Sequence, residues 1–146
     1  MPHGRLHSSL LIDESILIDA PPTTLVGLRQ AGINPAQIEH LLITHWHGDH
    51  VFGFPFFILE RKYISDRDGI APLTVHTRRG GRGLLEQLCH LAFPGTMEGI
   101  LDERVEWNYN HTSYAGQWQL ERFIVEHEPL VFPHGYTLQN KDNFVI

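Results

Sequence analysis

Residues 41–53 read LLITHWHGDHVFG, in which an apolar run is followed by three histidines and one aspartate within six positions. A strand that ends just before this cluster turns alternate side chains to one side, so His45 and His47 are expected to face the same point. The glycine that follows permits a turn that brings Asp49 and His50 to an adjacent point. The spacing therefore predicts a binuclear metal centre.

The ligand types narrow the choice of metal without fixing it. Histidine nitrogens and a carboxylate, with no cysteine among them, suit zinc, manganese or iron. The alternative is a set of solvated histidines in a polar loop, which would be the better explanation for a single histidine. Three histidines and an aspartate at this spacing behind a strand favour metal binding.

The composition is that of one globular domain, residues 1–146, with 42% hydrophobic and 19% charged residues. A net charge of −6 argues against a general nucleic-acid surface, although a local basic patch stays possible. Cys89 is the single cysteine, so no intrachain disulfide is expected and a cytoplasmic location is favoured. No signal-like or membrane-spanning apolar segment is expected, so a membrane partner is not predicted.

Apolar runs and turn residues outline a mixed architecture. Residues 95–115 are expected to be irregular. Strands around intermittent helices predict an α/β or α+β sandwich. The expected elements are strands at 8–13, 15–19, 40–44, 73–76, 120–125, 135–139 and 143–146, helices at 24–31, 51–59 and 82–93, and a capped turn at Asn34.

Residues 44–53, THWHGDHVFG, resemble the H-x-H-x-D-H signature of the metallo-β-lactamase fold superfamily, whose members are metallohydrolases with an αββα sandwich. Residues 8–20 are similar to the early hairpin of that fold, and residues 33–42 to its approach to the ligand strand. Within the superfamily, residues 48–55 most resemble ribonuclease Z and the related phosphodiesterases. The resemblance implies a metallo-β-lactamase-like αββα sandwich.

The resemblance also implies a third histidine on a later strand, ahead of a glycine-tyrosine pair. His127 is the favoured candidate, and His134 beside Gly135-Tyr136 is the weaker one. His127 would complete the first metal site, which also contains His45 and His47. The resemblance further implies that Asp49 and His50 bind the second metal ion and that Asp49 also orients the attacking water.

The family pattern is incomplete in this sequence. It implies a Gly-Asp turn and a late histidine for the second metal, and neither precedes Ile146. Residues 1–6 are also too short for the opening strand and glycine-rich turn of the family. We therefore expect an N-terminal portion of the fold, truncated at both ends, with a half-built second site. Its exposed apolar sheet face would favour a homodimer or a missing C-terminal half.

The implied activity is hydrolysis by a metal-activated hydroxide, with phosphodiesters as the favoured substrates. A thioester or lactone hydrolase of the same fold is one alternative, and a non-catalytic metal-binding fragment is another. The activity of this chain alone stays open. A nucleic-acid substrate is possible but not favoured, because the chain is acidic and only a short turn separates the strands at Tyr136 and Phe144.

Other polar groups receive more modest interpretations. Arg78, Arg79 and Arg82 alternate with glycines at a helix start and could hold a phosphate, but a solvated basic loop is the favoured interpretation. His40 and His76 flank strands and are expected to be packed or hydrogen-bonded rather than ligands.

Overall fold

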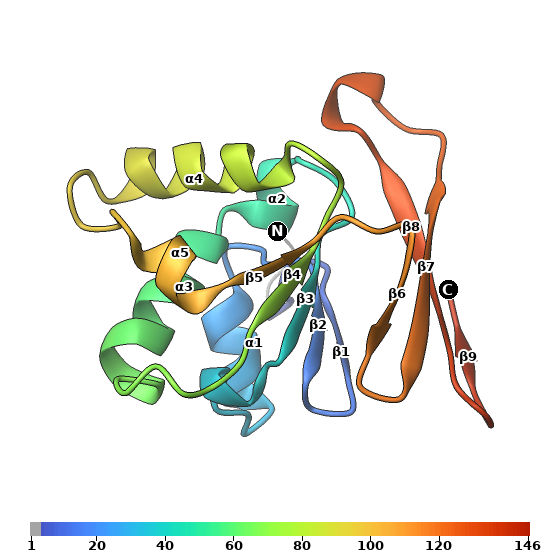
Figure 1. Cartoon of the computed structure of the whole chain (residues 1–146), viewed down its shortest axis with the longest axis horizontal. Coiled ribbons are helices and arrows are strands. Elements are labelled where there is room, and N and C mark those ends of the chain that lie inside the picture. The colour runs from blue at the N-terminus through green and yellow to red at the C-terminus, as the bar shows by residue number, and fades with distance from the viewer. Residues whose placement is uncertain (1–3) are drawn as a thin grey trace.

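The computed structural model describes residues 4–146 and arranges them in three layers, one of helices and two of β-sheet (Figure 1). The sheets have the strand orders β1-β2-β3-β4-β5 and β6-β7-β8-β9. The strand bounds are β1 Leu10–Ile12, β2 Ile16–Ile18, β3 His40–Leu42, β4 Thr74–His76, β5 Glu106–Asn108, β6 Thr112–Ala115, β7 Trp118–Ile124, β8 His134–Gln139 and β9 Phe144–Val145.

The helices lie on the face of the first sheet that points away from the second sheet (Figure 1). Their bounds are α1 Thr24–Gln30, α2 Gly48–Val51, α3 Phe54–Glu60, α4 Gly81–Ala92 and α5 Ile100–Arg104, with short turns η1 Pro35–Gln37, η2 Arg61–Ser65 and η3 Pro129–Val131. No helix among residues 4–146 covers the outer face of the second sheet. The arrangement is the α-β-β part of the predicted αββα sandwich.

Within the described residues, no helix is both long enough and apolar enough to cross a lipid bilayer.

The first sheet begins with the predicted hairpin. β1 pairs with β2 in antiparallel fashion, and Asp13 and Glu14 between them have φ values of 49° and 57°. Two residues with positive φ form the kind of tight turn whose twist matches that of the flanking strands. β2, β3, β4 and β5 then run parallel to one another. Because parallel strands share a direction, the residues that follow β2, β3 and β4 gather at one edge of the sheet.

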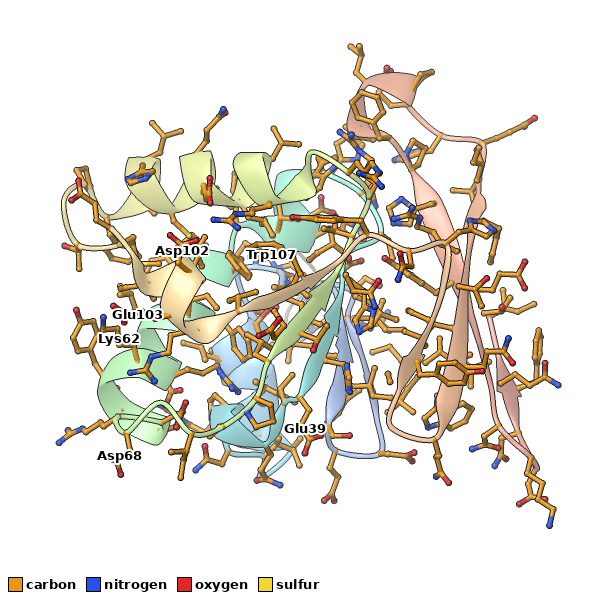
Figure 2. The ribbon with its side chains drawn as sticks, in the orientation of Figure 1. Glu39, Lys62, Asp68, Asp102, Glu103 and Trp107 are labelled. Carbon is orange, nitrogen blue, oxygen red and sulfur yellow. The ribbon has the colours of Figure 1, made fainter. Side chains whose placement is uncertain are left out.

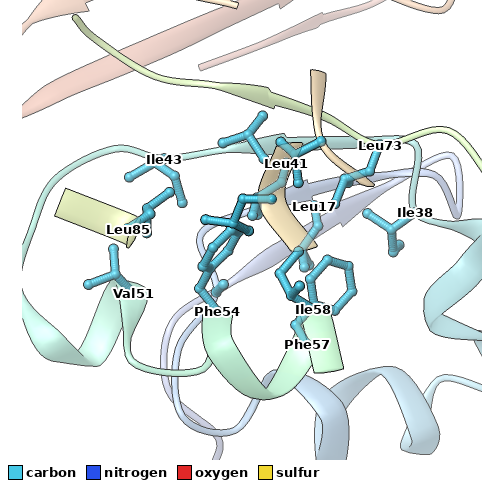
Figure 3. Packing of buried hydrophobic residues seen from close by; sticks show 14 of the residues in the cluster. Leu17, Ile38, Leu41, Ile43, Val51, Phe54, Phe57, Ile58, Leu73 and Leu85 are labelled. Atoms are coloured by element: carbon cyan, nitrogen blue, oxygen red, sulfur yellow. The ribbon is translucent and has the colours of Figure 1, made fainter. Parts of the chain in front are cut away.

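A large apolar core fills the space between the helices and the first sheet. Figure 3 shows Leu41 and Ile43 from the β3 region packed toward Phe54, Phe57 and Leu85 of the helical layer. Both phenylalanines are fully buried. Burial of one such side chain contributes roughly 1.5–3 kcal/mol. This core therefore fixes α3 on the sheet directly behind residues 44–50, which hold the predicted ligands and are called the ligand loop.

A smaller core lies between the two sheets. Leu42 belongs to it although its neighbour Leu41 belongs to the helical core, because successive side chains of a strand point to opposite faces. From the second sheet, Leu120 and Leu138 pack against Leu42 in the same cluster. The Trp118 indole in this core also donates a hydrogen bond to an Asp13 carboxylate oxygen at 2.6 Å.

The expectation that residues 95–115 are irregular is wrong. They contain α5, β5 and all of β6. β5 has three residues, Glu106, Trp107 and Asn108, which is too short to show an apolar alternation in the sequence. Its conformation is set by parallel pairing with β4, a contact that the local residues do not encode.

The predicted helix over residues 51–59 is two helices. α2 begins earlier, at Gly48, and the chain breaks at Gly53 before α3. The Gly53 N–H donates to the Ala20 carbonyl oxygen at 2.8 Å, and a Cβ at this position would lie 1.9 Å from the Pro21 carbonyl oxygen. The close approach of the segment after β2 therefore ends α2 and fixes the start of α3.

Ion pairs join the last turns of the helical layer. Lys62 Nζ lies 3.5 Å from a Glu103 carboxylate oxygen, and Figure 2 shows these two side chains close together on η2 and α5. Arg104 Nη1 lies 3.3 Å from a carboxylate oxygen of buried Asp66. These contacts hold α5 against the chain that follows α3.

Candidate metal centre

The ligand loop follows β3 at the edge where the parallel strands end. Backbone hydrogen bonds fix it from β8 and from η3: the His134 N–H donates to the Thr44 carbonyl at 3.1 Å, and the Trp46 N–H donates to the Val131 carbonyl at 3.3 Å. His47 then occupies the N-cap position of α2. The loop is therefore held by residues far away in the sequence as well as by its own turn.

Three imidazoles converge at this loop. One ring nitrogen from each of His45, His47 and His127 lies within 4.8 Å of the other two. The His127 Nε2 to His47 Nδ1 distance is 3.2 Å, and the three ring-to-ring distances are 4.9–5.1 Å. His127 reaches the loop from the segment after β7. Three converging imidazole nitrogens are a donor set that suits zinc or a similar divalent ion.

A second group of donors shares His45 with the first and adds Asp19 and His50. Asp19 follows β2, is 4% exposed and has a φ of 62°. One of its carboxylate oxygens accepts from the Thr44 N–H at 2.8 Å and the other from the Thr44 hydroxyl at 2.7 Å. The second oxygen also lies 2.6 Å from His50 Nδ1.

Sequence reasoning missed Asp19, which it took only as the end of a hairpin strand. A signal was present: Asp19 is an acid directly after the apolar strand Ile16–Ile18. An acid at this position becomes a candidate once β2 is known to run parallel to β3, because both strands then end at the same edge.

The hydrogen bonds around Asp19 assign protons to the histidines. The carboxylate accepts from His50 Nδ1–H, which leaves Nε2 of His50 with a lone pair for a ligand. The Thr44 hydroxyl donates to Asp19, so it accepts from His45 Nδ1–H at 3.0 Å, and His45 also keeps Nε2 free. Both rings thus offer Nε2 to the centre.

The same contacts set the basicity of the two rings. The hydrogen bond from His50 to Asp19 raises the pKa of His50 against the opposing effect of burial. Burial lowers the pKa of His45, and the neighbouring His50 charge lowers it further. A metal ligand must be neutral imidazole, and the environment of His45 favours that form.

Asp49 lies on the first turn of α2 with its side chain exposed. One carboxylate oxygen is 3.7 Å from His50 Nε2, but the residue belongs to neither group of converging donors among residues 4–146. The role of Asp49 at the second metal and at the attacking water stays a prediction.

His134 has a different environment from His127. It is buried, its Nδ1 lies 3.2 Å from the Phe132 carbonyl oxygen, and its Nε2 lies 3.3 Å from the Tyr136 hydroxyl. The single proton of that hydroxyl is shared between the carbonyl oxygens of Ile43 and His76, which lie 3.1 and 3.0 Å away. His134 and the glycine-tyrosine pair therefore tie the second sheet to the strand ends that carry the ligand loop.

The chain resembles known proteins in sequence and in fold. The family model described as Anti-Pycsar protein Apyc1 matches residues 6–80. Ribonuclease Z of Geobacillus kaustophilus is 40% identical over 80 residues, which are 55% of this chain and 24% of that protein. The chain spans about a quarter to two fifths of the length of the curated relatives it matches.

Two solved structures share the fold. The short form of human tRNase Z superposes with a TM-score of 0.66 at 17% identity, over 96% of this chain and 63% of that one. The metallo-β-lactamase fold protein YhfI of Bacillus subtilis gives a TM-score of 0.67 at 13% identity, over 97% and 55%. The family model covers just over half of the chain. The chain has the metallo-β-lactamase fold and ribonuclease Z among its sequence relatives, and it belongs to the Anti-Pycsar protein Apyc1 family.

Proposed function

We propose that this chain carries the metal-holding part of a metal-dependent hydrolase that acts on phosphodiester bonds. The observation that carries the proposal is the convergence of His45, His47 and His127 beside the Asp19–His50 pair. The sequence relatives are named ribonuclease Z, which supports phosphodiesters as the substrate class. The single, buried Cys89 supports a cytoplasmic location.

In this proposal His45, His47 and His127 hold the first of two divalent ions, with zinc favoured over manganese and iron. His50 and Asp49 belong to the second site. When bound, such an ion lowers the pKa of a water molecule to about 7 and so supplies a nucleophile at neutral pH.

The residues of the chain itself orient the site. Asp19 holds the Nδ1 proton of His50, and Thr44 holds that of His45, so that both rings present Nε2. Partners of this kind fix the tautomer and direction of a ligand ring. In this proposal Asp49, whose exposed side chain lies next to His50, orients the attacking water.

A non-catalytic metal-binding fragment is the second candidate. It is favoured by the exposed position of Asp49 outside the converging donors and by the share of the relatives that this chain spans. Hydrolysis of a thioester or lactone on the same fold is the enzymatic alternative.

Metal content and turnover test these candidates together. The chain is freed of metal with a chelator, reloaded with zinc or manganese, and analysed by mass spectrometry of the metals. Two tightly bound ions per chain with hydrolysis of bis(p-nitrophenyl) phosphate would support the hydrolase and exclude the fragment. One ion or none, without hydrolysis, would contradict activity of this chain alone. Turnover of p-nitrophenyl acetate but not of the phosphodiester would favour the ester-type alternative.

A further inference from the structure

A groove of about 820 Å³ opens beside the metal centre. His127 lines it together with the segment before β8, and the wall also contains Arg78 and Arg122. Glu126 is the acidic residue among its lining side chains. The groove therefore concentrates positive charge in a chain whose net charge is −6.

Arg78 lies in the loop that follows β4. Its guanidinium carbon is 3.6 Å from the centre of the Phe132 ring and 5.9 Å from that of Trp46. Its Nη1 donates to the Arg79 carbonyl at 2.9 Å, whereas its buried Nε–H has no hydrogen-bond partner. A buried donor without a partner carries a desolvation cost that a ligand acceptor would remove. The aromatic contacts fix the guanidinium plane in the groove wall.

Arg122 projects from β7 into the same groove. Its Nη2 lies 3.4 Å from the Tyr109 carbonyl oxygen, which is a weak contact at that length. Burial lowers the pKa of Arg78, and the nearby positive charge of Arg122 lowers it further. The two cations are thus close enough to repel each other.

Neither cation is neutralised by the protein. Arg82 and Arg104 pair with carboxylates, whereas no carboxylate among residues 4–146 lies within ion-pair distance of Arg78 or Arg122. Two guanidinium groups without a counter-charge at the wall of a groove are a suitable site for an anion. Guanidinium binds phosphate oxygens through paired N–H donors, which makes phosphate the best-matched anion.

We propose that Arg78 and Arg122 bind a phosphate group of the substrate and position it against the histidine centre. This inference rests on the proposed function and sharpens it. The arginines select a negatively charged phosphodiester over the neutral thioester or lactone that the same fold could otherwise accept. The two arginines position the substrate, because they line the groove wall and do not belong to the converging histidines.

The test uses the metal-free chain, in which no bound ion can hold phosphate, at pH 8. Inorganic phosphate is titrated at constant ionic strength, with chloride as the balancing anion, while the arginine Nε–H signals are followed by ¹H–¹⁵N NMR. We expect the Arg78 signal to shift with saturation. Arg78→Gln and Arg122→Gln should each raise the phosphate dissociation constant by about tenfold or more, as for loss of a hydrogen bond to a charged group.

Arg79→Gln is the matched control, because it removes the same charge from the same loop at an exposed position outside the groove. Its dissociation constant should change less than twofold. Arg78→Lys retains the charge but loses the paired donors, so it should bind phosphate more weakly than the unmodified chain and more tightly than Arg78→Gln. Thermal unfolding of each variant separates loss of fold from loss of binding.

Equal weakening by all three glutamine variants, or no saturable shift in the unmodified chain, would overturn the arginine site. Neither result would bear on metal stoichiometry, which tests the proposed function separately. Conversely, a chain that binds phosphate but no metal would support the arginine site and contradict the proposed hydrolase function.

Discussion

At the scale of single residues, the candidate centre depends on side chains that orient the three converging histidines of the first group without belonging to that group. Asp19 is the main example, because one buried carboxylate receives hydrogen bonds from His50 and twice from Thr44. A buried acceptor of this kind fixes both the loop backbone and a ring direction.

Asp19→Asn should weaken metal binding without removing a direct ligand of the first ion. The amide cannot replace all three contacts, so His50 loses its fixed tautomer, and a loss of about 10- to 100-fold in zinc affinity is expected. Competition with a chromogenic chelator measures the zinc affinity. Asp68→Asn, at an exposed position, is the control and should leave the affinity unchanged. Unchanged affinity in Asp19→Asn would contradict the orienting role.

His127→Ala and His134→Ala should affect different properties, metal content in the first variant and thermal stability in the second. The first removes one of three converging nitrogens and should lower the bound metal by one equivalent per chain, as measured by mass spectrometry. The second should leave stoichiometry intact but lower the melting temperature, because His134 is buried and contacts Phe132 and Tyr136. His90→Ala, on an exposed face of α4, should change neither quantity. If only His134→Ala lost metal, His134 and not His127 would be the third ligand.

A histidine pair away from the centre predicts loss of stability in acid. His40 and His76, which the sequence predicted to be packed or hydrogen-bonded, contact each other, with Nδ1 of the first 3.0 Å from Nε2 of the second. Burial lowers the pKa of His76 to about 4 from its usual 6.5, and the nearby charge of His40 adds to the effect. Between these values the unfolded chain binds the proton and the folded chain does not.

The free energy of unfolding should therefore be fully maintained above pH 6.5 and fall as the pH decreases toward 4. The shift corresponds to about 3 kcal/mol over that window. Urea unfolding at pH 7 and pH 5 measures it. His76→Gln, which cannot take up a proton, should show a smaller difference between the two pH values. An equal difference in both proteins would exclude His76 as the origin.

At the scale of elements, the break between α2 and α3 positions the ligand loop. Gly53 permits the segment after β2 to pass next to the helix start. The sequence predicted one helix here because its apolar run is continuous. The division is imposed by backbone from another part of the chain.

Gly53→Ala should destabilise the protein, since its Cβ would overlap the Pro21 carbonyl oxygen. Such overpacking costs about 1–3 kcal/mol or more. Gly83→Ala is the matched control within α4, where a Cβ would meet no atom within 4 Å. It should stabilise by roughly 0.5–1 kcal/mol through higher helix propensity. Chemical unfolding of both variants checks the opposite signs.

Most elements were predictable where the local pattern was strong. The first hairpin, α1 and α4 were expected within one or two residues of their bounds, because apolar period and turn residues agree there. β5 and α5 were not, since three-residue and five-residue elements carry too little periodicity and depend on neighbours.

At the scale of the whole molecule, the outer face of the second sheet is exposed. Tyr114 and Phe144, which pair with Gln119 and Gln139 on this face, are 66% and 58% exposed. An apolar surface on a sheet face is a site for association. The prediction of a homodimer or of a complementing C-terminal half is tested by light scattering after size-exclusion chromatography. A dimer mass would support the first, and a monomer mass would leave the complementing segment as the favoured prediction.

The sequence by itself determined the fold and predicted the ligand loop, because His45, His47, Asp49 and His50 lie within six positions and their relation follows from local backbone geometry. Only the tertiary structure decided that Asp19 orients the loop and that Arg78 and Arg122 share a groove with His127. Those relations join residues on different strands and loops. They exist only after β2 and β3 pair in parallel and the second sheet packs against the first.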